Sequence, residues 1–157
     1  MDPAVESRFR TARVIHAAIV VSLVIYVVLI HVLAGVRDWK GTAATPAVAG
    51  VMRWVFYSLG AAEFLGVLVA RSRLLSSDAL VEIGRRSGRD PALRELQSRM
   101  VILLAIAESI AVYGLILFVL TARLADFYLL WVPALVAVLA LTPPRDLWTQ
   151  VGGRRPG

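Results

Sequence analysis

Four long runs of apolar residues, separated by polar stretches, dominate the chain. They cover residues 14–34, 51–70, 100–121 and 127–142, and the fourth is short and carries Pro133. A run of about twenty apolar residues is long enough to cross a bilayer as a helix. The pattern therefore predicts an all-α integral membrane four-helix bundle that forms a single membrane domain over residues 1–157.

The composition supports this fold class and excludes several others. Of the 157 residues, 59% are hydrophobic, and the mean hydropathy is +0.74. A water-soluble domain of this size could not bury so much apolar surface. The sequence contains no cysteine, so it has no disulfides and no thiolate metal sites. The formal charge is +6, but the cations flank the apolar runs rather than forming a basic domain, so we expect no nucleic-acid partner.

The distribution of basic residues predicts how the bundle is oriented. With four crossings, both termini and the loop 71–99 share one side, and that side holds thirteen of the seventeen Lys and Arg residues. The positive-inside rule therefore places the termini and this loop in the cytoplasm. Asp90 is a suitable N-cap and Pro91 a suitable first helical residue, so we expect the third helix to begin near Pro91. The use of sixteen arginines against one lysine is typical of a GC-rich bacterial genome, which points to a multi-pass protein of a bacterial inner membrane.

Two carboxyl groups interrupt the apolar runs. Glu63 lies eight residues before Arg71, and Glu108 lies nine residues after Arg99. At about 1.5 Å per residue, both lie about 12–14 Å inside the cytoplasmic boundary, at matching depth. A charged residue at the centre of a span costs about 2.5–3.5 kcal/mol on insertion scales, and ionisable residues there are candidates for function.

The residues alone leave two interpretations of these acids equally open. A carboxyl in apolar surroundings favours its neutral form, which makes it a reloadable proton carrier, and its two oxygens could instead bind a monovalent cation. Alternatively, each acid is protonated and only ties two helices together by a hydrogen bond. The nearby candidate partners are Tyr57, Ser58, Ser109 and Tyr113, whereas Arg53 lies too far along its helix.

The sequence around Glu108 resembles a known family. Residues 107–116 read AESIAVYGLI. This stretch resembles the ion-carrying helix of the c-type proteolipid subunits of rotary ATP synthases and vacuolar-type ATPases. The resemblance lies within residues 105–118 and implies that Glu108 binds the transported ion. It also implies supporting roles for Ser109, Tyr113 and Gly114, of which Tyr113 and Gly114 help to pack the acid.

The rest of the chain departs from that family's pattern. The partner helix of a proteolipid is rich in regularly spaced glycines that pack many copies into a ring, whereas the second run here has only Gly60 and Gly66 among bulky residues. The long loop 71–99 replaces a short polar turn, and the first and fourth runs have no counterpart in a two-helix subunit. The resemblance therefore concerns the ion site and does not extend to the features that pack a ring.

The leading hypothesis is a proton- or cation-handling subunit of a membrane complex, with Glu108 as principal carrier and Glu63 as its partner. The partners would be the lipid bilayer, a proton or monovalent cation, and further copies or other membrane subunits. The alternatives are a structural or accessory four-helix subunit without transport and a small four-helix exchanger. The sequence has no P-loop, dinucleotide fingerprint, HExxH motif or nucleophile elbow, so we expect no enzymatic activity, and no metal or cofactor. His16 and His31 have a spacing suited to two haems, but no further histidine completes either ligand set.

Overall fold

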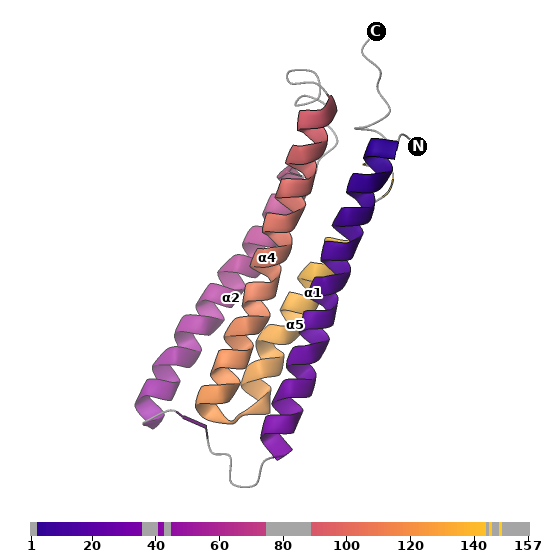
Figure 1. Cartoon of the computed structure of the whole chain (residues 1–157). Helices are drawn as coiled ribbons and strands as arrows, with labels where there is room; N and C mark the ends of the chain where they lie inside the picture. Colours follow the sequence, from indigo (N-terminus) through magenta and orange to yellow (C-terminus); the bar gives the residue numbers. More distant parts are fainter. Residues whose placement is uncertain are drawn as a thin grey trace.

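The computed structural model describes residues 3–35, 41–42, 45–74, 89–143, 145 and 148. The regular elements within these residues are helices: α1 (Pro3–Gly35), α2 (Pro46–Leu74), α4 (Arg89–Thr121) and α5 (Leu124–Ala140). They run alternately up and down in one bundle (Figure 1). The predicted all-α four-helix membrane bundle is confirmed. Three of the helices are long and apolar enough to cross a membrane, and the fourth, α5, is apolar but has only 17 residues.

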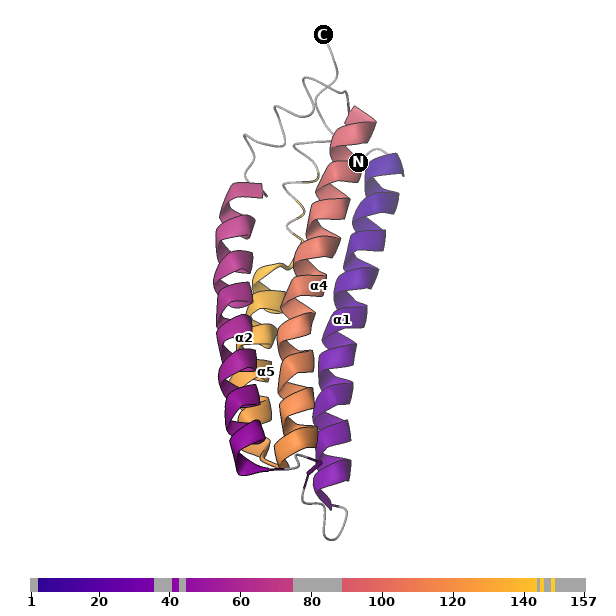
Figure 2. The same ribbon diagram turned by 90° about the vertical axis from the view of Figure 1, so that its left-hand side faces the viewer.

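Helix α4 lies at the centre of the bundle. It packs against α1, α2 and α5, whereas α1 and α2, as far as the structure describes them, do not contact each other. Figures 1 and 2 show α4 between α1 and α2 in both views, with α5 against it. This position explains why 44% of the apolar part of α4 is buried, against 11% for α1 and for α2.

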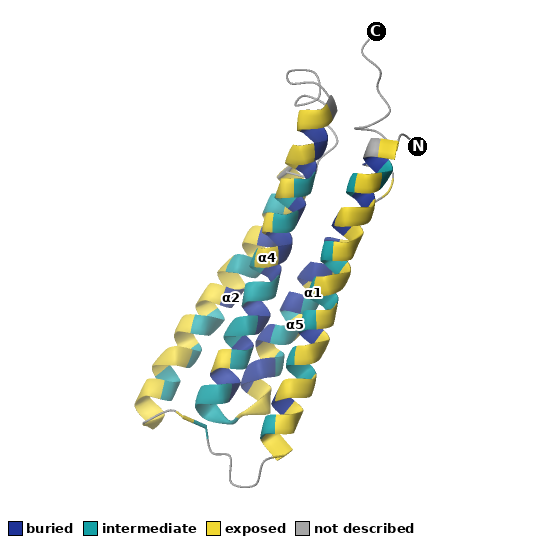
Figure 3. Cartoon of the chain, viewed as in Figure 1, coloured by how far each residue is buried: buried dark blue, intermediate teal, exposed yellow. Residues whose placement is uncertain are grey.

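The outward faces of α1 and α2 are apolar. Val14 on α1 is 63% exposed and Trp54 on α2 is 75% exposed, and exposed residues line both helices in Figure 3. Large contiguous apolar surfaces are rare on soluble monomers. In a bilayer such a surface needs no protein cover, because lipid tails are as apolar as the side chains.

Local sequence signals set the ends of the helices. Thr45 precedes Pro46 and caps α2, since its hydroxyl accepts a hydrogen bond from the backbone N–H of Val48 at 3.3 Å. Helix α4 begins at Arg89, so the Asp90-Pro91 pair lies within its first turn instead of just before it. Between α4 and α5 the chain reverses at Ala122, whose φ of 55° is the left-handed conformation common after a helix C-terminus.

Helices α1 and α4 continue beyond their apolar runs. Their first turns pack together around a separate apolar cluster, which consists of Val5, Phe9, Ala12, Ala92, Leu93, Leu96, Met100 and Trp148. The predicted loop 71–99 is therefore partly helical, because residues 71–74 belong to α2 and residues 89–99 to α4. The rest of that loop, residues 75–88, lies outside the described part of the chain.

Glycine allows α5 to approach its neighbours closely. A Cβ on Gly114 of α4 would lie 2.8 Å from the backbone oxygen of Phe127 and 3.2 Å from Leu130. A Cβ on Gly60 of α2 would lie 2.6 Å from the side chain of Leu130. Both glycines therefore serve the packing of α5 rather than the flexibility of their own helices.

Candidate functional site

Glu108 projects from α4 toward α1. Its Oε1 accepts two hydrogen bonds from hydroxyl groups on α1, one from Ser22 at 2.5 Å and one from Tyr26 at 3.0 Å. Ser22 and Tyr26 are four residues apart, and this spacing places both on the same face of the helix. All three side chains are partly buried.

Glu63 projects from α2 toward α4 and is held in the same way. Its Oε2 accepts a hydrogen bond from Ser109 at 2.6 Å, and its Oε1 accepts one from Tyr113 at 2.7 Å. These donors are again four residues apart, and all three side chains are partly buried. Tyr113 also stacks against Phe56 of α2, with ring centroids 5.4 Å apart, which fixes the ring beside the carboxyl.

The two carboxyls lie at one level of the bundle, because Glu108 directly precedes Ser109, the donor to Glu63. Their shared level agrees with the matching depth expected from their similar spacing from Arg71 and Arg99. They lie on different sides of α4, however, and no hydrogen bond joins them within the described residues. Successive residues of a helix differ by about 100° in direction, so Glu108 can face α1 while Ser109 faces α2.

The two acids differ in whether their hydrogen bonds can remain as they are when a proton is added. Both donors to Glu108 converge on Oε1, and a carbonyl oxygen has two lone pairs, so the neutral acid keeps both bonds with its proton on Oε2. Glu63 receives one donor on each oxygen, so protonating it requires one hydroxyl to turn away. Ser109 can do so, because the carbonyl oxygen of Ile106 lies 2.7 Å from its Oγ and offers a second acceptor.

A third carboxyl, Asp126, was not among the candidates from sequence. It is 5% exposed and lies in the first turn of α5. Nε of Arg53 lies 2.7 Å from its Oδ2, and the hydroxyls of Tyr57 and Thr121 donate to it at 2.9 and 2.8 Å. The sequence offered one signal for this ion pair, since Arg53 and Asp126 each lie near the N-terminal end of an apolar run. Asp126 thus forms a fixed ion pair with Arg53, and its contacts join α2, α4 and α5.

Polar side chains also join α1 to α5. Nε2 of His16 lies 3.0 Å from the carbonyl oxygen of Val138, and because a carbonyl only accepts, Nε2 carries the proton. In the other direction, Nε1–H of Trp131 donates to the carbonyl oxygen of Leu23 at 3.0 Å. His31 bonds within its own helix. Among the described residues, no group of three or more His, Cys, Asp or Glu side chains is arranged to hold a metal ion.

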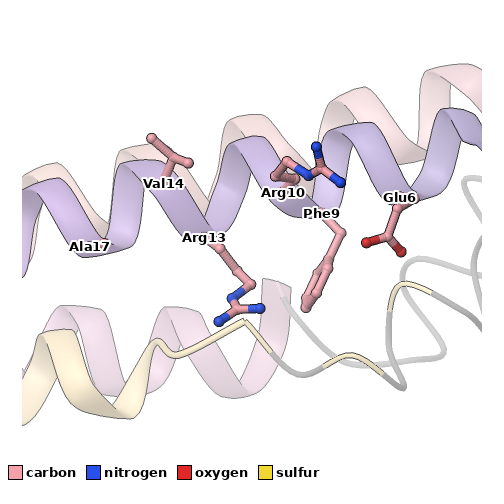
Figure 4. A pocket seen from close by; sticks show the side chains of 6 residues that line it. All are labelled: Glu6, Phe9, Arg10, Arg13, Val14 and Ala17. Atoms are coloured by element: carbon pink, nitrogen blue, oxygen red, sulfur yellow. The ribbon is translucent and has the colours of Figure 1, made fainter.

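A hollow lies beside the first turns of α1. Its volume is about 430 Å³, and its lining residues, labelled in Figure 4, are Glu6, Phe9, Arg10, Arg13, Val14 and Ala17. The guanidinium of Arg13 lies 5.8 Å from the centre of the Phe9 ring, within range of a cation–π interaction. The hollow thus combines exposed arginines with an apolar floor at the end of the bundle where α1 begins.

The residues predicted from sequence are distributed over two sites. Glu108 meets α1, whereas Ser109 and Tyr113 serve Glu63, and Gly114 contacts α5. Ser22 and Tyr26 were missed, because a two-helix family offers no counterpart for α1. The Ser-x-x-x-Tyr spacing, present in α1 as in α4, is the signal that could have identified them.

Comparison with known proteins gives one match. Residues 77–121 match the family model of the C subunit of ATP synthase. The matched segment includes the whole of α4 and therefore Glu108, Ser109 and Tyr113. Neither a curated protein nor a solved structure matches the chain. The similarity is thus local, and it falls on the helix that takes part in both carboxyl sites.

Proposed function

We propose that this membrane protein is a proton- or cation-handling, proteolipid-like subunit of a membrane complex. Glu108 is the principal carrier, and Glu63 is its partner at the same level of the bundle. Further copies or other membrane subunits complete the complex, since four helices leave little room for a gated pathway. The chain itself is expected to have no enzymatic activity.

One contrast between the acids carries the proposal. Asp126 is neutralised by the guanidinium of Arg53, whereas Glu63 and Glu108 form no ion pair within the described residues and are held by hydroxyls. A buried charge without a counter-charge is costly, so an ionised Glu in these surroundings favours uptake of a mobile proton or cation. Carboxyl and hydroxyl oxygens are also the ligands that hard cations prefer.

The match to the C subunit of ATP synthase supports the same assignment. Through the resemblance described above, the acid at position 108 corresponds to the residue that carries the ion. The geometry adds a reason of its own, because both hydrogen bonds to Glu108 fall on one oxygen and leave the other available. Glu63 lacks this freedom until Ser109 turns, which suits a partner rather than the principal carrier.

Carbodiimide labelling of the protein in membranes, read by mass spectrometry, tests the proposal. Carbodiimides react with protonated carboxyls that they reach through lipid. We expect selective labelling of Glu108, slowed at high pH and by sodium if sodium is the ion. Glu95, a solvent-exposed acid, serves as the internal control. If Glu95 reacts while Glu108 and Glu63 do not, the carboxyls are enclosed and the proposal fails.

The second candidate function is a structural or accessory subunit. It is favoured by the full occupation of both Glu63 oxygens and by the side chain to backbone bonds that fasten α1 to α5. Under this alternative, the carbodiimide labelling of Glu63 and Glu108 depends on neither pH nor sodium. A small four-helix exchanger is the third candidate, and it predicts competition by an organic cation rather than by sodium.

We further propose that both termini face the cytoplasm of a bacterium. This orientation would bring the exposed Arg10 and Arg13, which are labelled in Figure 4, toward the anionic headgroups of the cytoplasmic leaflet, in accord with the positive-inside rule. Because the chain has no cysteine, Ser7→Cys and Thr42→Cys give single reporters at opposite ends of the bundle. In intact spheroplasts, an impermeant maleimide is expected to label the cysteine at 42 but not that at 7. The reverse pattern contradicts this orientation.

A further inference from the structure

Two eight-residue stretches of the chain share a pattern. Residues 19–26 of α1 read IVVSLVIY, and residues 106–113 of α4 read IAESIAVY. Isoleucine, serine and tyrosine recur at the first, fourth and eighth positions, and the fifth to seventh positions are aliphatic in both. The third position differs, since α1 has Val21 where α4 has Glu108.

The two stretches also make corresponding contacts. Ser22 lies 2.8 Å from the carbonyl oxygen of Ile19, and Ser109 lies 2.7 Å from that of Ile106. Both serines reach a glutamate of the neighbouring helix, and the tyrosine one turn later binds the same glutamate. We call Ser22 with Tyr26 the α1 hydroxyl pair, and Ser109 with Tyr113 the α4 hydroxyl pair.

The residues at the fifth position of the two stretches also pack in the same way. Leu23 of α1 and Ile110 of α4 are both 0% exposed and belong to the same apolar core. The two stretches are therefore alike in orientation as well as in sequence, because α1 presents its hydroxyl pair to Glu108 and α4 presents its own pair to Glu63. These contacts form a series, in which the α1 hydroxyl pair binds the acid of α4 and the α4 hydroxyl pair binds the acid of α2.

The series ends within the chain on both sides. In α1, Val21 replaces the acid and is 55% exposed. In α2, alignment of Glu63 with Glu108 places Phe64 and Leu68 where serine and tyrosine would stand. Thus α1 has a hydroxyl pair without an acid, α2 has an acid without a hydroxyl pair, and α4 has both.

We propose that α1 is a partial copy of the α4 pattern that completes the Glu108 site within one chain. Ser22 and Tyr26 are positioning residues for the proton or monovalent cation at Glu108, and Val21 ends the series. A single chain therefore supplies both the acid and the hydroxyl pair of each carboxyl site and needs no second copy to complete either. This inference rests on the proposed function for its ligand, but the pairing of side chains can be tested separately.

Double-mutant cycles of thermal stability in detergent test the pairing. Tyr26→Phe and Glu108→Met are expected to be non-additive, as are Tyr113→Phe and Glu63→Met, because each pair shares one hydrogen bond and methionine lacks the carboxyl acceptor. The crossed cycles, Tyr26→Phe with Glu63→Met and Tyr113→Phe with Glu108→Met, serve as matched controls and are expected to be additive. Equal coupling in direct and crossed cycles, or coupling in neither, overturns the proposal.

Carbodiimide labelling then separates positioning from packing. In the variant S22A/Y26F we expect Glu108 to label about tenfold faster, because the ionised form loses two hydrogen bonds. The pH dependence of its labelling should change, whereas the labelling of Glu63 should be unaffected. The matched variant S109A/Y113F should affect Glu63 in the same way. Ser22→Thr retains a hydroxyl and should behave more like the wild type.

The outcomes distinguish this inference from the proposed function. If the direct cycles couple but S22A/Y26F leaves the pH profile of Glu108 unchanged, α1 only packs and the positioning role is overturned. If labelling of Glu108 ignores pH and sodium in the wild type, the proposed function fails, and the ligand of the inference fails with it. The pairing of the hydroxyl pairs with their glutamates would still be supported by the double-mutant cycles.

Val21→Glu tests whether the series ends at α1. The added carboxyl would point away from the α4 hydroxyl pair, and both pairs are already occupied. We expect it to label faster than Glu108, as an acid without a hydroxyl pair would. If it is protected as well as Glu108, a second copy covers it, and the claim of a series closed within one chain is overturned.

Discussion

Three carboxyl groups inside the bundle differ in what faces them. Asp126 meets a guanidinium and two hydroxyls, whereas Glu63 and Glu108 each meet a serine and a tyrosine. A fixed counter-charge holds an acid ionised, while hydroxyls can serve a carboxyl in either protonation state, because they both donate and accept. A carboxyl group is thus a structural tie at Asp126, whereas at Glu63 and Glu108 it has the surroundings that the proposed function requires of an exchangeable site.

Replacing Asp126 with Asn tests the structural role. The substitution removes the charge facing Arg53, and leaving that guanidinium without its partner should cost about 1–3 kcal/mol of unfolding free energy. The side chain of Arg53 is 25% exposed, so water offsets part of this loss. Glu95→Gln, which removes an exposed pair with Arg99, should change stability by less than about 0.5 kcal/mol. Equal losses in reversible unfolding would contradict the assigned role of Asp126.

Sequence predicted only part of the carboxyl sites. Ser109 and Tyr113 were among the candidate partners, because they follow Glu108 closely in α4, although the acid that they bind is Glu63. Besides lacking a counterpart in a two-helix family, Ser22 and Tyr26 could not be placed from sequence, because the rotation of α1 about its own axis depends on packing against α4 and α5. Asp126 was missed because its partner, Arg53, is distant in sequence and acts only once the helix ends meet.

At the scale of the helices, α4 organises the bundle. It carries an acid for the α1 hydroxyl pair, a hydroxyl pair for Glu63, and Gly114 for the approach of α5. Hydropathy predicted the apolar part of each helix, since length and apolarity suffice for that. It did not cover the extensions of α1 and α4 below residues 14 and 100, because these turns are amphipathic and pack against each other and Trp148. The Asp90-Pro91 pair nevertheless predicted that α4 begins near Pro91.

Gly114→Ala tests the close approach of α4 and α5. The new methyl would lie 2.8 Å from the backbone oxygen of Phe127, which cannot move aside without shifting α5. We expect a loss of about 1–3 kcal/mol in stability, typical of overpacking. Gly66→Ala is the control, because nothing lies within 4 Å of its added methyl and the change should be neutral or stabilising by up to about 1 kcal/mol. If both variants unfold alike, the packing role of Gly114 is wrong.

At the scale of the whole molecule, apolar side chains cover the outward faces of α1 and α2, and three carboxyl groups lie between the helices beside an apolar core. The exposed faces of α1 and α2 suit lipid, while the carboxyl sites lie between helices. The local match to the C subunit of ATP synthase covers α4, and α1 and α5 surround this helix within the same chain. The molecule therefore combines a proteolipid-like helix with neighbours that occupy its contact faces.

The central claim is that Glu108 exchanges a proton or cation inside the membrane, and infrared difference spectroscopy of the reconstituted protein tests it most directly. The absorption of a protonated carboxyl should diminish when the buffer is changed from acidic to alkaline, or when sodium is added if sodium is the ion. This change should diminish in Glu108→Gln, where Glu63 remains, and persist in Asp126→Asn. A change of the same size in Glu108→Gln, or none in the wild type, would contradict the account.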